Sequence, residues 1–109
     1  MDLVGYSFGA WVLAGWSQTR NTSGFRIVLV APPVGFMDFS DIPVIEGLHT
    51  VIVGGRDDFA PADQVKTRTA QWCPTAELHV LDRADHFFGG HLDDLSRILG
   101  QMLHQKIDP

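Results

Sequence analysis

A serine, an aspartate and a histidine in this chain are of the types that together perform nucleophilic acyl transfer. Ser7 is the centre of a Gly-x-Ser-x-Gly motif, Asp57 lies in a glycine-containing turn, and His86 lies in a later loop. A serine hydroxyl becomes nucleophilic when a base takes its proton, and imidazole suits this role because its ordinary pKa is near neutrality. A carboxylate then orients the imidazole and stabilises its charged form. Together these three residues predict an acyl-transfer reaction that passes through a covalent intermediate on Ser7.

The Gly-x-Ser-x-Gly motif lies at a junction that would strain its serine. Residues 1–4 predict the end of a buried strand, and residues 8 to about 19 predict an apolar helix. At such a junction the turn is sharp and holds the serine clear of the sheet. We expect Gly5 and Gly9 to keep Cβ atoms out of the contact between strand and helix. The helix start offers N–H groups and a positive dipole end to a developing oxyanion.

Strand and helix patterns alternate along the rest of the chain. Further strands are predicted at residues 25–30, 50–53 and 78–81, and helices at about 63–72 and 92–104. This alternation predicts an α/β fold with a parallel sheet of about four strands and flanking helices, forming a single domain over residues 1–109.

Two apolar patterns refine this expectation. The continuous apolar run at residues 25–30 predicts a strand that is buried on both faces, as in parallel sheets. The last helix carries one apolar stripe, formed by Leu92, Leu95, Leu99, Met102 and Leu103.

The predicted topology brings the chemically active residues to one edge of the sheet. In parallel α/β sheets ligands bind outside the carboxyl ends of the strands. Ser7 follows the first strand, Asp57 and Asp58 follow the third, and the His86 loop follows the fourth. We therefore expect a binding site where these three segments meet.

Alternatives exist for each member of this group. Asp57 is favoured as the acid, but Asp58 could replace it, and either could simply form a turn. His86 could be a structural loop histidine paired with a nearby aspartate, with His91 as the fallback base. The remaining histidines start a strand, lie within one or end a helix.

Large apolar residues near the expected site could bind substrate. The loop at residues 31–39 carries three of them, which could line an acyl or aromatic pocket or equally fill the core. The candidate substrate-binding residues are Tyr6, Phe36, Met37, Phe59 and Phe88; Phe39 is the third apolar residue of the loop.

The composition of the chain argues against several other classes of function. The net charge of −5 and the lack of a basic run argue against nucleic-acid binding. No apolar run approaches the roughly 18 residues of a membrane span, and residues 1–20 do not have a signal-peptide pattern. The single cysteine, Cys73, is expected to be a small buried residue and indicates a reducing, cytoplasmic compartment. The aspartates and histidines at residues 82–94 match no common ligand spacing, so neither a metal nor a cofactor is expected.

Four motifs carry a resemblance to a known group of proteins. They are Gly-Tyr-Ser-Phe-Gly-Ala at residues 5–10, Ala-Pro-Pro-Val at 31–34, Gly-Gly-Arg-Asp-Asp at 54–58 and Ala-Asp-His-Phe-Phe at 84–88. With these motifs the chain resembles the α/β-hydrolase superfamily, in particular small bacterial predicted hydrolases related to the dienelactone-hydrolase and KANL3/Tex30-like groups. The chain order Ser, Asp, His is also the order found in this superfamily.

The resemblance implies a role for each site residue. Ser7 would be the nucleophile, Asp57 the acid and His86 the base, with the Phe8 main-chain N–H as one oxyanion donor. Dienelactone hydrolases proper have cysteine at the nucleophile position, so the serine of this chain points to a small ester or thioester as substrate.

The resemblance covers nearly all 109 residues but only the C-terminal half of the family's fold. It implies that the family's N-terminal strands, and the loop with the second oxyanion donor, are missing. Residues 1–5 would then form an exposed sheet edge, which favours self-association. We therefore expect a homo-oligomer through this edge. An inactive hydrolase remnant that acts as an oligomeric or interaction module is the alternative function.

Overall fold

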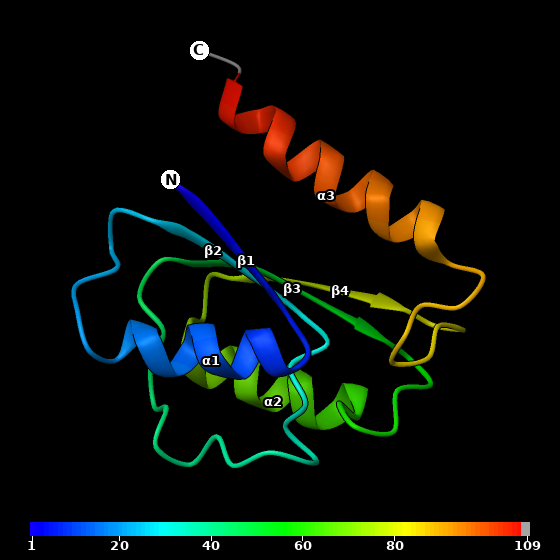
Figure 1. Cartoon of the computed structure of the whole chain (residues 1–109), viewed down its shortest axis with the longest axis horizontal. Coiled ribbons are helices and arrows are strands. Elements are labelled where there is room, and N and C mark those ends of the chain that lie inside the picture. Colours follow the sequence, from blue (N-terminus) through cyan, green and yellow to red (C-terminus); the bar gives the residue numbers. More distant parts are fainter. Residues whose placement is uncertain (108–109) are drawn as a thin grey trace.

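The computed structural model describes the backbone of residues 1–107 and the side chains of residues 1–102. Strands and helices alternate in this part of the chain (Figure 1). The elements are β1 (Asp2–Tyr6), α1 (Phe8–Ser17), β2 (Arg26–Val30), β3 (Leu48–Gly54), α2 (Ala62–Trp72), β4 (Glu77–Leu81) and α3 (Leu92–Ile107). The strands form one parallel sheet in the order β1-β2-β3-β4, which confirms the predicted α/β architecture.

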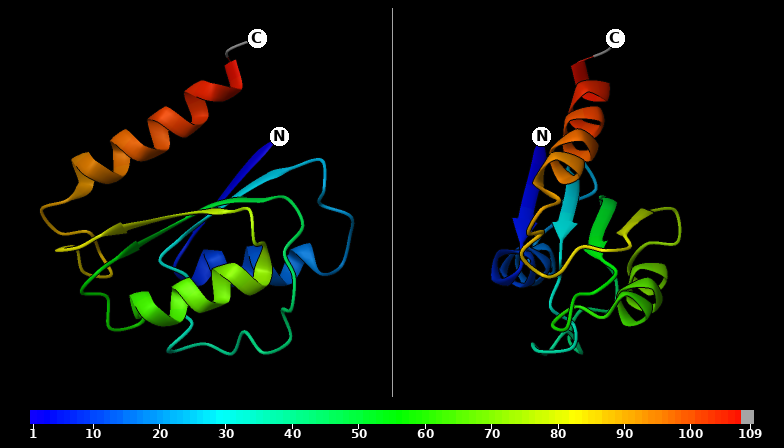
Figure 2. Two further views of the ribbon diagram at one scale, coloured as in Figure 1. Left: turned by 180° about the vertical axis from the view of Figure 1, so that it is seen from behind. Right: turned by 90° about the vertical axis from the view of Figure 1, so that its right-hand side faces the viewer.

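The helices form two layers, one on each face of the sheet. Helices α1 and α2 lie on one face and α3 lies on the other (Figures 1 and 2). On β2, Ile27 and Leu29 belong to the core under α1 and α2, whereas Val28 and Val30 belong to the core under α3. All four are at most 2% exposed, so the predicted burial of this strand on both faces is confirmed.

Close packing between β1 and α1 depends on small residues. Ala10 and Ala14 are fully buried on the sheet side of the helix. A Cβ on Gly5 would lie 2.7 Å from the Gly9 carbonyl oxygen and 2.8 Å from the Ala10 Cα, so only glycine fits there. The same expectation for Gly9 was wrong, because a Cβ on Gly9 would meet no described atom within 4 Å.

Helix α3 buries a slightly different stripe from the one predicted. Ile98 and Met102 are buried against the sheet, and Leu95 and Leu99 pack beside them. Leu92, the first residue of the helix, is 62% exposed, so its assignment to the stripe was wrong. The Leu103 side chain lies outside the described residues.

The long connection between β2 and β3 is fixed to both helices of its layer. The Trp72 indole N–H donates to the Ile42 carbonyl at 3.0 Å, and the Trp11 indole N–H donates to the Asp38 carbonyl at 2.9 Å. Phe39 is 1% exposed and packs on Trp72, so it is a core residue. These anchors hold the rest of the loop beside the carboxyl ends of β1 and β3.

Strand β1 forms one edge of the sheet and pairs with β2 alone among the described residues. A bidentate ion pair between Arg26 and Asp2 fastens the two strands, and Arg26 also donates to the Met102 carbonyl of α3. The outer side of β1 is open, with Val4 48% exposed and Tyr6 44% exposed. Within the described part of the chain, no helix combines the length and apolar character that a bilayer crossing requires.

Candidate active site

Ser7, His86 and Asp57 form a continuous chain of hydrogen bonds at the carboxyl edge of the sheet. The Ser7 Oγ lies 2.7 Å from the His86 Nε2, and the His86 Nδ1 lies 2.8 Å from the Asp57 Oδ2. A carboxylate only accepts hydrogen bonds, so this geometry fits a proton on Nδ1 and leaves Nε2 to accept from the serine hydroxyl. The arrangement can therefore activate the hydroxyl as a nucleophile.

Ser7 has the strained backbone that its position between strand and helix predicts. Its φ of 55° and ψ of −118° lie in a region that L-residues rarely adopt. Such a conformation costs on the order of 1–3 kcal/mol and persists where the surroundings enforce it. Here the Ser7 N–H donates to the Val30 carbonyl at 2.9 Å, and the Ser7 carbonyl accepts from the Ala10 N–H at 2.9 Å.

The Asp57 carboxylate is fully buried and held on both oxygens. Its Oδ1 accepts from the Phe59 and Ala60 main-chain N–H groups at 2.8 and 2.7 Å. These bonds leave Oδ2 directed at His86. Asp58, the alternative acid, is exposed and takes no part in this chain of hydrogen bonds.

His86 is 6% exposed, and aromatic rings surround its imidazole. The ring centroids of Phe59, Phe87 and Tyr6 lie 4.9, 5.3 and 5.9 Å from that of His86. These rings restrict access of water to the base. The fallback residue, His91, lies just before α3, and its Nδ1 faces the Asp94 carboxylate at 3.5 Å, whereas His86 is the histidine that contacts Ser7.

A mostly apolar cavity of about 290 Å³ opens beside Ser7. Its lining consists of Ser7, Phe8, Pro33, Phe36, Met37, Phe59, His86 and Phe87. Three predicted substrate-binding residues, Phe36, Met37 and Phe59, therefore lie in its wall. The structure does not place the other two there: Tyr6 lies outside the lining, and Phe88 is 1% exposed in the core under α3.

Phe87 lines the cavity and is 67% exposed, although the sequence pattern did not single it out. Of the two phenylalanines in the Ala-Asp-His-Phe-Phe run, the second had been expected to bind substrate. Phe88 has a φ of 55°, a left-handed turn that carries its ring into the core while the preceding ring stays outside. Phe87 directly follows His86 in the chain, and this adjacency was the sequence signal that could have identified it as a cavity residue.

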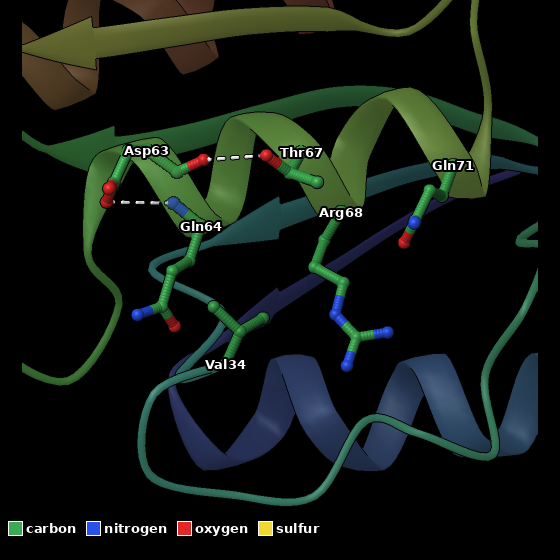
Figure 3. Close-up of a pocket in the computed structure, with 6 residues that line it drawn as sticks. All are labelled: Val34, Asp63, Gln64, Thr67, Arg68 and Gln71. Atoms are coloured by element: carbon green, nitrogen blue, oxygen red, sulfur yellow. Dashed lines mark hydrogen bonds between the residues drawn. The ribbon is translucent and has the colours of Figure 1, made fainter.

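A larger hollow, of about 400 Å³, shares no lining residue with this cavity (Figure 3). It is lined by residues of α2 and by Val34, and Arg68 extends into it. It contains none of the three hydrogen-bonded residues and has a polar wall of exposed helix side chains. We therefore assign the candidate site to the smaller cavity beside Ser7.

Donors for an oxyanion are scarce in the cavity wall. Phe8 is the first residue of α1, so its N–H has no acceptor within the helix. The Phe36 and Met37 N–H groups donate to the Pro33 carbonyl. Those of Phe59 and Phe87 donate to the side chains of Asp57 and Asp85. The Phe8 N–H, next to Ser7 in the chain, therefore lacks a helical acceptor and is available to a bound carbonyl oxygen.

The described residues hold no group of three or more His, Cys, Asp or Glu side chains that could bind a metal ion. Cys73 is only partly buried at the end of α2, with its Sγ 3.4 Å from the Thr75 hydroxyl.

The environment of the Tyr6 hydroxyl disfavours its ionisation. Burial, followed by the negative charges of Asp57 and Asp85, raises the pKa of Tyr6 above its ordinary value of 10.0. Tyr6 thus stays protonated at neutral pH.

Comparison with known proteins gives matches among solved structures. A scan of protein-family models and a search of curated proteins found no match. The chain is 30% identical to an α/β serine hydrolase homologue from Coxiella burnetii, with a TM-score of 0.79 over 94% of this chain and 48% of the other. It is 27% identical to XC6422 from Xanthomonas campestris, an α/β serine hydrolase without a lid, with a TM-score of 0.79 over 95% and 46%.

A protein of unknown function from Agrobacterium tumefaciens has 24% identity and a TM-score of 0.80, over 98% of this chain and 50% of that one. The chain thus spans about half the length of these structures. Since the match covers 94% of this chain with a TM-score of 0.79, the fold of this chain, a four-stranded parallel sheet with flanking helices, is α/β-hydrolase-like.

Proposed function

We propose that this chain is a serine hydrolase that acts on a small ester or thioester. The observation that carries this proposal is the hydrogen-bonded chain of Ser7, His86 and Asp57, with distances of 2.7 and 2.8 Å. The names of the structural neighbours support hydrolysis as the reaction class. The apolar wall of the adjacent cavity supports an uncharged acyl group of modest size.

The mechanism has two steps that use the same base. In the first, the Ser7 Oγ attacks the substrate carbonyl and passes its proton to the His86 Nε2, and the Phe8 N–H binds the oxyanion. The leaving alcohol or thiol takes this proton as the acyl-enzyme forms. In the second, a water molecule gives a proton to His86 and attacks the acyl group, which leaves as a carboxylic acid while Ser7 regains its proton.

A single oxyanion donor would limit the rate. Loss of one such donor typically lowers kcat by about 100- to 1,000-fold. We therefore expect slow turnover of the chain by itself.

Labelling by a fluorophosphonate tests this function directly. The reagent should form a covalent adduct on Ser7 with loss of fluoride, detected by intact mass and peptide mapping. Ser7→Ala should abolish the adduct and the hydrolysis of p-nitrophenyl acetate. Ser96→Ala, which alters an exposed serine of α3, should leave both unchanged. A folded protein that forms no adduct would contradict the proposal.

The open edge of β1 favours a second candidate function, an assembly module that pairs with a second copy of the chain. Exposed apolar side chains gather on β1 and the start of α1, namely Met1, Val4, Tyr6, Phe8 and Val12. A standard interface buries about 800 Å² per partner, of which about 57% is apolar, and exposed apolar side chains of this kind form the apolar part of such interfaces.

Light scattering on Val4→Lys tests this second function, with Val80→Lys on the opposite edge strand β4 as the matched control. Both positions are exposed. A dimer that Val4→Lys dissociates and Val80→Lys preserves would support pairing through β1. A wild-type monomer at high concentration, or equal effects of both changes, would overturn it.

A further inference from the structure

Tyr6 joins the strand that carries Ser7 to the loop that carries His86. The Tyr6 hydroxyl donates to the His86 main-chain carbonyl at 2.8 Å, across 80 positions of sequence. The tyrosine ring also stacks on the imidazole, with centroids 5.9 Å apart and planes at 26°. Tyr6 is the last residue of β1 and directly precedes Ser7. Its hydrogen bond therefore connects the strand that leads to Ser7 with the loop that carries His86.

The other bonds at His86 hold its ring, not its main chain. Ser7 and Asp57 bind the two imidazole nitrogens. Within the loop, Asp85 accepts from the Phe87 and Gly89 N–H groups, which shapes a local turn without tying it to β1. Among the described residues, the Tyr6 hydroxyl is the group that hydrogen-bonds β1 to the main chain of this loop. The start of the loop is held separately at the end of β3, where the Arg56 N–H donates to the Ala84 carbonyl at 2.9 Å.

We propose that Tyr6 is a positioning residue, which holds the His86 Nε2 at hydrogen-bond distance from the Ser7 Oγ by fastening the His86 loop to β1. This role depends on the proposed hydrolase function. Tyr6 does not line the cavity, so it acts on the rate of reaction at Ser7 and not on substrate binding. Its hydroxyl can donate only while protonated, and its raised pKa is consistent with this requirement.

Tyr6→Phe removes the hydroxyl and retains the ring. We expect kcat for p-nitrophenyl acetate, and the rate constant for fluorophosphonate labelling per active site, to fall by about 3- to 10-fold, as loss of one hydrogen bond would give. KM should stay unchanged. The matched control is Thr69→Val, which removes a hydroxyl that donates to the Val65 carbonyl at 2.7 Å in α2, far from the site. It should alter neither rate by more than about twofold.

A second measurement does not depend on a reactive serine. In Ser7→Ala protein, the proton on the His86 Nδ1 should give a downfield NMR resonance because it is hydrogen-bonded to Asp57. Adding Tyr6→Phe should shift or broaden this resonance, whereas Thr69→Val should not. If the wild-type protein failed to react with the fluorophosphonate, the proposed hydrolase function would be refuted. The His86 Nδ1 proton resonance would still show whether Tyr6 positions the imidazole.

Two outcomes would overturn the inference. One is a Tyr6→Phe protein that labels at the wild-type rate and keeps the same imidazole resonance. The other is an equal loss of rate in Thr69→Val, since that would show a general loss of stability.

Discussion

Removing the Asp57 carboxylate in two different ways should separate its catalytic role from its structural role. Asp57→Asn retains the Oδ1 that accepts from the Phe59 and Ala60 N–H groups. It places an amide NH2 where Oδ2 faced the His86 Nδ1. The imidazole must then accept at Nδ1 and carry its proton on Nε2, so it can no longer take the proton of Ser7. We expect kcat to fall by about 10,000-fold, the size of effect known for a wrong tautomer.

Asp57→Ala should also damage the fold. It leaves the buried Ala60 N–H and the part-buried Phe59 N–H without an acceptor. The loss at the buried group alone costs about 1–3 kcal/mol. Domains of this size are stable by only about 5–15 kcal/mol. Asp57→Asn keeps both bonds, so we expect it to lower the free energy of unfolding by only about 1 kcal/mol.

Urea denaturation followed by tryptophan fluorescence measures the stability, and p-nitrophenyl acetate hydrolysis measures the activity. Asp58→Asn is the control, because this neighbouring aspartate is exposed and should change stability by no more than about 0.5 kcal/mol. The reasoning would be refuted if Asp57→Asn kept activity within tenfold of wild type, or if Asp57→Ala and Asp57→Asn were equally stable.

Four further predictions concern Gly5, Gly9, Tyr6 and Phe36. Gly5→Ala should cost more than about 2 kcal/mol in urea denaturation, because its Cβ would lie 2.8 Å from the Ala10 Cα. Gly9→Ala, with open space around its Cβ, should instead gain about 0.5–1 kcal/mol in the helix. Tyr6 has a raised pKa in the folded state, so its contribution to stability is complete below about pH 10 and is lost as the pH rises through the folded-state pKa. Absorbance at 295 nm can follow this titration, since the chain has a single tyrosine, and an ordinary pKa would count against it. Phe36 packs edge-on against Phe59 with ring centroids 5.5 Å apart, so Phe36→Ala should raise KM for an ester with an aromatic acyl group, such as p-nitrophenyl benzoate, by about 3- to 10-fold and should affect p-nitrophenyl acetate less. Equal effects on both esters would contradict a binding role for this ring.

Most of the fold was accessible from the sequence because its elements carry strong local signals. The run of residues 27–30 is apolar on both faces, as a central parallel strand requires. Parallel topology then forces the segments after β1, β3 and β4 to one edge, so Ser7, Asp57 and His86 could be placed together before any distance was known. Their catalytic roles stay a prediction, as does a cytoplasmic location.

The finer features of the site depended on backbone turns that residue type does not reveal. The left-handed φ of Phe88 decides which of two adjacent phenylalanines faces the cavity. Tyr6 was expected to contact substrate as one of several large apolar residues near the site, yet its hydroxyl reaches a carbonyl 80 residues away. Such a contact exists only after the sheet has set the distance between β1 and the loop after β4.

The separation of the site residues along the chain also has a consequence for folding kinetics. Ser7 and His86 are 79 positions apart, and all strands of the intervening sheet are parallel. Contacts of such long sequence separation form late, because the loop-closure entropy must be overcome before they add stability. Secondary structure and the core under α1 and α2 can form while the nucleophile still lacks its base. During refolding, reactivity at Ser7 would therefore mark the end of the process, after tryptophan fluorescence has already reached its native value.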